Sequence, residues 1–257
     1  MSYALITGAS KGIGKAIAEE LALRKHHLLL VSRSKELLLA ESRRLENEHQ
    51  IKVDFFAIDL SLPGSPKKVI DWCNEKNYGV NILVNNAGYG LSGPFEKYTG
   101  DDYLNMMQVN MAVPVELTAL FLPMLKKESG AHILNVASTA AYQAVPLLSV
   151  YSATKSFVLS FSRGLSQELK GTPVSVTCVS PGGTDTEFVV RAQIGKKGLD
   201  MARKFNMSPE SVARIAVNAM FAGKPEKVTG FLNKLGVFST WLLPKTLVER
   251  TAMKIYK

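Results

Sequence analysis

The sequence is poor in the residues that build disulfide-stapled or metal-organised proteins. Its 257 residues include only two cysteines, Cys73 and Cys178, and four histidines. The cysteines lie far apart among apolar neighbours, as small core residues do, so we predict no disulfide framework and a reducing compartment. No histidine pairs with cysteines or carboxylates at ligand spacing, so we predict no metal site.

Long apolar runs and targeting signals are also missing. We find no apolar stretch near the roughly 20 residues that span a bilayer. The first apolar run follows Met1, Ser2 and Tyr3 directly, which leaves no room for a signal or transit peptide. We therefore expect a cytoplasmic protein that is at most peripheral at a membrane surface. A Gly-x-Ser-x-Gly elbow is absent as well, which argues against a serine hydrolase.

The charge is basic, but it lacks the pattern of a nucleic-acid binder. The 31 Lys and Arg residues outnumber the 22 Asp and Glu residues, for a formal net charge of +9. Such an excess suits nucleic acid, an acidic membrane surface or a phosphate-bearing ligand. The basic residues are scattered, however, and no basic run alternates with aromatic residues as a single-strand binder requires. We therefore expect no nucleic-acid partner.

What the sequence does contain is a regular alternation of short apolar runs and helical patterns. Strands are predicted at residues 4–6, 28–31, 53–58, 82–84, 131–136 and 174–179. Helices are predicted at residues 12–25, 35–48, 66–77, 101–127 and 149–170. Pro114 and Pro123 are expected to kink or end the helix at 101–127.

This alternation predicts the fold class. Short, uniformly apolar strands are typical of a parallel sheet that is covered on both faces, and strand–helix alternation implies right-handed crossovers. We predict an α/β protein with a doubly wound parallel sheet flanked by helices. The chain shows no repeat, low-complexity tract or linker, so residues 1–257 are expected to form a single domain.

A glycine-rich turn joins the first predicted strand to the first predicted helix. Residues 7–14 read Thr-Gly-Ala-Ser-Lys-Gly-Ile-Gly. Glycines permit a tight turn and the close approach of a phosphate, and the N–H groups at a helix start bind a pyrophosphate. The spacing differs from the common dinucleotide fingerprint and from a P-loop. A tight turn without a ligand therefore remains an alternative at this point.

The end of the second predicted strand indicates which dinucleotide would bind. An acidic residue there hydrogen-bonds the adenosine ribose in NAD-binding folds, but this chain has Ser32 and Arg33 instead. Arg33 can bind a 2′-phosphate through charge-assisted hydrogen bonds, and Lys11 in the glycine turn adds a second cation. The pattern favours NADP(H), with an exposed surface role for Arg33 as the alternative.

Three residues form a candidate catalytic set. Tyr151 and Lys155 are one helical turn apart, so they share a helix face. A nearby ammonium favours the phenolate and lowers the pKa of a tyrosine, which makes the tyrosine usable as an acid or base. Ser138 follows the fifth predicted strand, where its hydroxyl can bond a substrate oxygen and stabilise developing alkoxide charge. A Tyr-x-x-x-Lys pair alone arises often by chance. It indicates a catalytic site only because the glycine turn and Ser138 occur in the same chain.

Taken in order, these motifs resemble the short-chain dehydrogenase/reductase family from Tyr3 to about Phe231. The residues that carry the resemblance are residues 7–14, Asp59, residues 85–88, Asn110, Ser138, Tyr151, Lys155, Pro181 and Gly182. The resemblance implies a Rossmann-type fold and the interconversion of a carbonyl and an alcohol by an NADP(H)-dependent enzyme. A non-catalytic NADP(H)-binding scaffold or sensor is the alternative.

The resemblance also implies a role for each matching residue. Tyr151 would donate the proton, Ser138 would orient the carbonyl, and Lys155 would also bind the nicotinamide ribose. Asn110 would bend its helix and hold a water that links Lys155 to solvent, although Asn110 and Asn85 could each simply bond backbone groups. Gln143 is a further candidate for the substrate pocket, as is Tyr89. The implied cofactor-binding residues are Gly8, Ser10, Lys11, Gly12, Ile13, Gly14, Arg33, Asp59, Leu60, Asn86, Ala87, Gly88, Tyr151, Lys155, Pro181, Gly182, Thr184 and Thr186.

Two apolar segments bear on the substrate. Residues 184–207 resemble the family's substrate loop and form either an apolar lid or an ordinary helix pair. The tail, residues 231–257, alternates apolar and basic residues, so it lies on an anionic membrane surface, packs on its own domain or meets a partner subunit. A lid and a membrane-edge tail together suggest a lipid-like substrate, such as a 3-oxoacyl thioester, a steroid-like ketone or a long-chain aldehyde.

The resemblance also bears on assembly. Family members dimerise through the two long helices after the fourth and fifth strands. Small residues would allow close helix approach there: Ser152, Ala153, Ser156, Ser160 and Gly164. The extended tail would obstruct the further pairing that gives tetramers, so we expect a homodimer rather than a tetramer.

Overall fold

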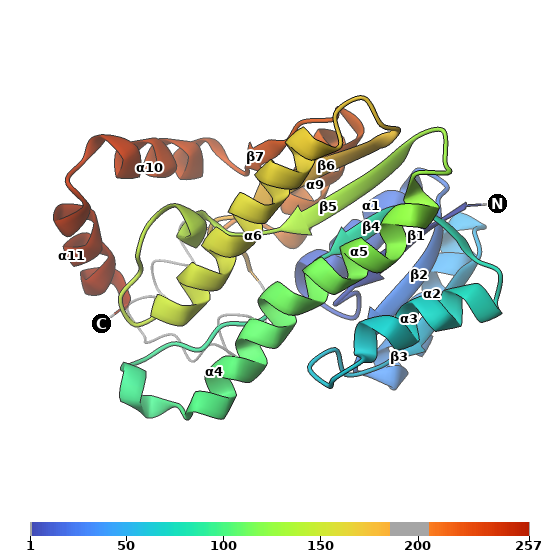
Figure 1. The fold of residues 1–257 in the computed structure, drawn as a ribbon, viewed down its shortest axis with the longest axis horizontal. Coiled ribbons are helices and arrows are strands. Elements are labelled where there is room, and N and C mark those ends of the chain that lie inside the picture. Colours follow the sequence, from blue (N-terminus) through green and yellow to red (C-terminus); the bar gives the residue numbers. More distant parts are fainter. Residues whose placement is uncertain (1, 186–205, 257) are drawn as a thin grey trace.

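The computed structural model describes residues 2–185 and 206–256. The described residues form one parallel sheet with the strand order β3-β2-β1-β4-β5-β6-β7 (Figure 1). The strands are β1 (Ser2–Thr7), β2 (His27–Ser32), β3 (Val53–Ala57), β4 (Gly79–Asn85), β5 (Ala131–Val136), β6 (Val174–Ser180) and β7 (Glu226–Val228). The order reverses between β1 and β4, which is where ligands bind in doubly wound sheets.

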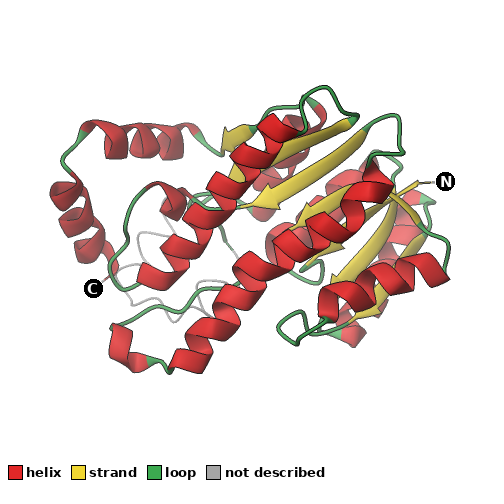
Figure 2. Cartoon of the chain, viewed as in Figure 1, coloured by secondary structure: helices red, strands yellow, loops and turns green. Residues whose placement is uncertain are grey.

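Helices cover both faces of this sheet (Figure 2). On one face α1 (Gly12–Leu23), α2 (Lys35–His49) and α9 (Pro209–Phe221) contribute to a core cluster that includes Ile6 of β1. On the other face α3 (Ser65–Glu75) and α5 (Val113–Leu125) pack against a cluster that includes Leu5. Leu5 and Ile6 are neighbours in β1, and their side chains lie in the cores on opposite faces of the sheet, because successive side chains of a strand alternate between its two faces. The predicted doubly wound α/β fold is confirmed.

The long predicted helix at residues 101–127 is interrupted. It comprises α4 (Gly100–Met107), a π-helical turn η2 (Gln108–Ala112) and α5. The turn centres on Asn110, and Pro114 lies just after it, at the start of α5. Pro123 lies inside α5. A π-helical turn lies at Asn110, and the bend expected there stays a prediction.

This same segment corrects one prediction from the sequence. Residues Gly100–Leu125 form a 26-residue helical stretch that is long and apolar enough, by length and composition, to cross a bilayer. Its window is 44% buried inside the fold, and the α5 side chains Leu117 and Phe121 lie fully buried in the core. The apolar character of this stretch is therefore that of a helix covering a sheet.

The C-terminal part of the described chain adds elements that the sequence did not predict. α9 covers the sheet, and β7 extends it by one short parallel strand beside β6. Two further helices follow, α10 (Phe231–Leu242) and α11 (Lys245–Tyr256), and they stand at the end of the molecule beyond β7 (Figure 1). Most of the predicted substrate loop, including Thr186, lies outside the described residues.

Candidate active site

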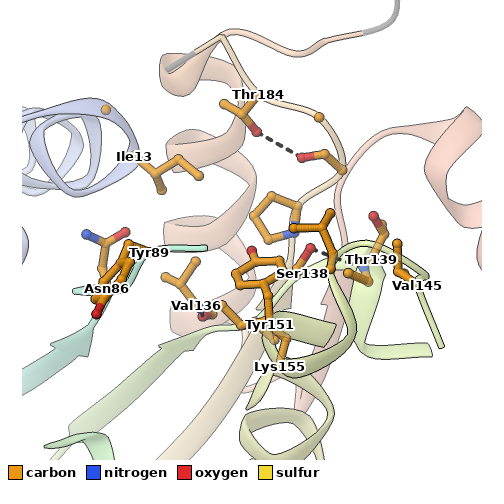
Figure 3. A pocket seen from close by; sticks show the side chains of 18 of the residues that line it. Ile13, Asn86, Tyr89, Val136, Ser138, Thr139, Val145, Tyr151, Lys155 and Thr184 are labelled. Carbon is orange, nitrogen blue, oxygen red and sulfur yellow. Dashed lines mark hydrogen bonds between the residues drawn. The ribbon is translucent and has the colours of Figure 1, made fainter. Parts of the chain in front are cut away.

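A large cavity opens where the strands end. Its volume is about 1020 Å³, and its lining includes the residues that follow six parallel strands: Gly8, Arg33, Asp59, Asn86, Ser138 and Pro181. The carboxyl ends of parallel strands meet at one edge of the sheet, so residues distant in sequence gather there. Figure 3 shows Ile13, Asn86, Ser138, Tyr151 and Thr184 arranged around this space.

The cavity brings together nearly all the residues predicted to hold the cofactor. The described ones that line it are Gly8, Ser10, Lys11, Gly12, Ile13, Arg33, Asp59, Leu60, Asn86, Ala87, Gly88, Tyr151, Lys155, Pro181, Gly182 and Thr184. Gly14 lies behind the turn instead of in the lining. Gln143 and Tyr89, the predicted substrate-pocket residues, line the same cavity.

The glycine turn has the geometry of a phosphate cradle. Gly8 and Gly12 have φ values of +66° and +55°, which side-chain-bearing residues rarely adopt. No described side chain caps the first turn of α1, and that turn holds no acidic residue. Its N–H groups therefore remain available to an anion at the cavity wall. The turn fits a pyrophosphate.

The adenosine end of the cavity carries a cation and an unpartnered hydroxyl. The Arg33 guanidinium lies 3.7 Å from the Asp59 carboxylate. Burial alone would raise the pKa of Asp59, but hydrogen bonds from Ser61 and the Arg33 charge outweigh it, so the pKa lies below its usual value. The buried Ser32 Oγ finds no partner among the described residues. A 2′-phosphate would satisfy both Ser32 and Arg33, so the residues present fit NADP(H).

Tyr151 and Lys155 project from the same face of α6 (Ser149–Glu168) into this cavity, beside Ser138 (Figure 3). The Lys155 Nζ lies 5.8 Å from the centre of the Tyr151 ring. It also donates a 2.9 Å hydrogen bond to the carbonyl oxygen of Val136. Burial lowers the pKa of Lys155 to about 8. Lys155 therefore supplies a positive charge, at neutral pH, next to the phenol.

Ser138 is held by the short helix that follows β5. It is the N-cap of η3 (Thr139–Tyr142), and its Oγ accepts a hydrogen bond from the Ala140 N–H at 3.1 Å. At the other end of η3, the Tyr142 hydroxyl donates to Glu226 of β7 at 2.7 Å. Tyr142 thus ties the loop that carries Ser138 to the edge strand. No local pattern predicts this contact, because Glu226 lies in a three-residue strand without a recognisable periodicity.

Asn110 lies behind the cavity wall and not in its lining. Its amide exchanges hydrogen bonds with both backbone groups of Tyr89 and donates to Thr154 at 3.0 Å. A Cβ on Gly88 would lie 3.0 Å from the Asn110 Oδ1 and 3.4 Å from the Lys155 Nζ, so both residues flank Gly88. The backbone bonding expected of Asn110 is present, and the predicted water relay stays a prediction.

Asn85 corrects a second expectation. Its amide donates to two side chains, Asn135 at 2.8 Å and Thr118 at 3.3 Å, and not to backbone groups. Asn135 in turn donates to Ser162 at 2.8 Å. This buried polar chain crosses from β4 and β5 to α6, and so fixes the helix that bears Tyr151 relative to the sheet.

The histidine prediction also needs correction. The fold brings His49 together with Glu19 and Glu48, whose potential ligand atoms all lie within 4.8 Å of one another. The Arg44 guanidinium forms ion pairs with both glutamates, and the His49 Nε2 lies 2.7 Å from Glu19. A cation of the chain already pairs with both glutamates, so we read the cluster as an ion-pair network between α1 and α2.

The tail supplies cavity residues that sequence reasoning missed. One side of α10 and α11 faces the cavity with Asn233, Gly236, Val237, Thr240, Leu247, Val248, Thr251 and Ala252. A Cβ on Gly182 would lie 2.3 Å from the Asn233 Oδ1, so α10 packs directly on the segment after β6. The cavity-facing side of α10 and α11 therefore packs on the chain's own domain, which was one of the alternatives left open for the tail. The amphipathic pattern of the tail was visible, but not which side would face inward.

A family model described as short chain dehydrogenase matches residues 2–196. Very-long-chain 3-oxoacyl-CoA reductase-B of Danio rerio is 33% identical over 258 residues, which is 98% of this chain and 79% of the relative. Hydroxysteroid dehydrogenase-like protein 1 of Gallus gallus is 35% identical over 198 residues, or 76% of this chain and 59% of the relative.

Solved structures show the same likeness. A short-chain dehydrogenase from Sphingobium yanoikuyae in complex with NADPH has a TM-score of 0.82 and 30% identity, and the match covers 94% of this chain and 95% of that one. L-sorbose reductase from Gluconobacter frateurii, complexed with NADPH and L-sorbose, has a TM-score of 0.78 and 25% identity over 88% of this chain and 94% of that one. The family model spans the glycine turn and the candidate catalytic residues, and its match ends before the tail.

Proposed function

The chain belongs to the short-chain dehydrogenase family, and on that premise we propose that it reduces apolar ketones, such as 3-oxoacyl thioesters or steroid-like ketones. It is an oxidoreductase of Rossmann-type fold that acts on the carbonyl/alcohol pair and uses NADP(H). The alternative of a non-catalytic scaffold is therefore set aside. We also propose that residues 1–257 form a single domain.

Bound NADPH supplies the reducing equivalent, and the chain's own residues handle the substrate oxygen and its proton. Ser138 donates a hydrogen bond to the carbonyl oxygen and orients it. Tyr151 delivers its phenolic proton to that oxygen as the alcohol forms, so that one ketone, one NADPH and one proton are consumed for each alcohol made. The Lys155 ammonium stabilises the phenolate left behind. Asn110 acts as a positioning residue for Gly88 and for the neighbourhood of Lys155.

The observation that carries the substrate class is the wall opposite the glycine turn. Aliphatic side chains from the loop after η3, from α10 and from α11 face the same cavity as Tyr151: Val145, Leu148, Leu232, Val237, Leu243, Leu247 and Val248. Such a wall favours apolar ligand atoms. The relatives named for very-long-chain 3-oxoacyl-CoA reduction and for hydroxysteroids support this choice.

Steady-state NADPH oxidation with 3-oxoacyl thioesters of rising chain length tests the proposal. We expect kcat/KM to rise by roughly 4-fold for each methylene until the wall is covered, because each buried CH₂ contributes about 0.8 kcal/mol. Val248→Asp should flatten this series while short-chain turnover persists, whereas Thr246→Asp, at an exposed neighbour outside the lining, should preserve it. Preferred turnover of a small polar sugar would contradict the proposal.

Arg33 is proposed to bind the 2′-phosphate that distinguishes NADPH from NADH. We expect Arg33→Ala to raise the KM for NADPH by about 10- to 100-fold, since hydrogen bonds to charged groups contribute about 1.5–3 kcal/mol. The KM for NADH should change little. Arg43→Ala removes the same charge from an exposed position on α2 and serves as the control. Equal effects of Arg33→Ala on both cofactors would show that Arg33 does not read the phosphate.

We propose a homodimer formed through α5 and α6. Phe157 and Phe161 of α6 stack with their ring centres 6.2 Å apart, and Phe157 is partly exposed, so an apolar strip lies on the outer side of this helix. A monomeric mass in sedimentation equilibrium would contradict the dimer.

We propose a cytoplasmic location as well. Both cysteines are free and buried, which agrees with a reducing, cytoplasmic location.

A further inference from the structure

Helix α10 is amphipathic with its apolar side turned outward. At 100° per residue, five large apolar side chains fall on one side of the helix: Phe231, Leu235, Phe238, Trp241 and Leu242. They are between 53% and 79% exposed. The opposite side, with Asn233, Gly236 and Thr240, faces the cavity. An exposed apolar patch of this size marks a surface that is covered in use, and we call these five residues the outer face of α10.

The outer face is continuous with the entrance to the cavity. Leu232, Leu243 and Leu247 line the cavity and are at the same time 63%, 45% and 51% exposed. Side chains that belong to both the lining and the surface mark the rim of an opening. This rim lies on α10 and at the start of α11, next to Trp241 and Leu242. Whatever covers the outer face therefore lies at the mouth of the substrate cavity.

Charge identifies what the outer face meets. Residues 227–248 contain Lys227, Lys234 and Lys245 but no Asp or Glu. Glu226 and Glu249 flank this segment, and Glu226 is already paired with Tyr142 and Arg163. The ammonium of Lys234, together with burial and the Lys224 charge, lowers the pKa of Lys227, so these lysines lie close together. A groove of about 540 Å³ beside the outer face is lined by Lys234 and Lys245 together with the rings of Phe238 and Trp241. Aromatic rings next to lysines suit the headgroup region of an anionic bilayer.

We propose that the outer face of α10 docks on an anionic membrane surface and opens the cavity rim to it. A second copy of the chain fits less well, because a two-fold contact would bring the lysines of both copies together with no acidic residue of residues 227–248 between them. On the bilayer, the aromatic rings enter the headgroup layer while the lysines meet lipid phosphates. A lipid-like ketone then reaches Tyr151 from the bilayer, a consequence that rests on the proposed function.

Vesicle flotation of the full chain with NADPH tests the docking. The vesicles are pure phosphatidylcholine, or equal parts of phosphatidylcholine and phosphatidylserine. We expect the protein to float with the mixed vesicles only. Phe238→Ser/Trp241→Ser should lower the partition coefficient by at least about 10-fold, since burying one such side chain contributes about 1.5–3 kcal/mol. Lys234→Glu/Lys245→Glu should lower it by at least about 20-fold, at about 1 kcal/mol for each lysine.

Matched controls carry the same changes elsewhere on the surface. Leu23→Ser/Leu62→Ser alters two leucines of similar exposure, and Lys126→Glu/Lys127→Glu reverses two exposed lysines after α5; neither pair should affect flotation. The docking is wrong if the unaltered chain does not bind the mixed vesicles, or if it binds them and the α10 variants bind equally well. It is also wrong if the outer face holds two copies of the chain together and Phe238→Ser/Trp241→Ser abolishes that self-association. Turnover of a water-soluble ketone, measured alongside, separates the two proposals: retained turnover without flotation refutes the docking alone, and flotation without turnover refutes the function alone.

Discussion

Replacing Tyr151 by phenylalanine is expected to lower kcat by about 10³-fold or more while NADPH still binds. A positioned general acid contributes about 10²- to 10⁴-fold, and the lost hydroxyl also removes a hydrogen bond to the developing alkoxide. The ring of Tyr151 is 7% exposed and packs in a cluster with Met106, Val145 and Leu148. Phenylalanine keeps this packing, so the fold and the cofactor cleft should survive.

Stopped-flow single turnover and NADPH titration by fluorescence separate chemistry from binding in this variant. Tyr98→Phe is the matched control, because it removes a hydroxyl that donates to the Ser92 carbonyl at 2.9 Å, outside the cavity lining. It should keep the turnover of the unaltered enzyme. If Tyr151→Phe retains more than a tenth of kcat, another group is the proton donor. If Tyr151→Phe loses NADPH affinity in parallel with kcat, the substitution acts on cofactor binding and not on proton transfer.

The cofactor half of the molecule was predictable because each of its signals is local. Leu28–Val31 of β2 and Ile82–Val84 of β4 are uninterrupted apolar runs, as a strand with both faces covered requires. The glycine turn and the Tyr-x-x-x-Lys pair each lie within eight residues. Parallel topology then brings the strand ends together, which is why so many predicted residues line one cavity. The strand boundaries differed by a few residues, since pairing with neighbours decides where a strand ends.

The substrate half was less predictable because its contacts are long-range. β7 is only Glu-Lys-Val, and it is a strand because β6 offers it an edge. The periodicity of α10 shows an apolar side and a polar side, and the usual expectation would turn the apolar side inward. Here the polar side packs inward, with Asn233 against Gly182, while Phe238 and Trp241 lie outside. No local pattern encodes that choice.

Gly14→Ala is expected to lower NADPH affinity by about 100-fold or more and to destabilise the fold by about 1–3 kcal/mol. A Cβ at Gly14 would lie 2.3 Å from the carbonyl oxygen of Gly8 and 2.3 Å from the Asn86 Nδ2. Neither neighbour can move away easily. The Gly8 oxygen belongs to the backbone of the turn, and the Asn86 side-chain amide donates a hydrogen bond to the Thr7 carbonyl oxygen at 2.9 Å. The added methyl group therefore displaces the phosphate-binding turn itself.

Gly100→Ala provides the contrast that makes this expectation specific. Gly100 opens α4, and a Cβ there would meet nothing within 4 Å. Alanine at such a site should raise the free energy of unfolding by up to about 1 kcal/mol, because it restricts the unfolded chain, and NADPH affinity should not change. Chemical denaturation and calorimetric titration measure both quantities. A Gly14→Ala protein that binds NADPH like the unaltered chain would show that the turn can relax, and that its close backbone packing is not what shapes the cofactor site.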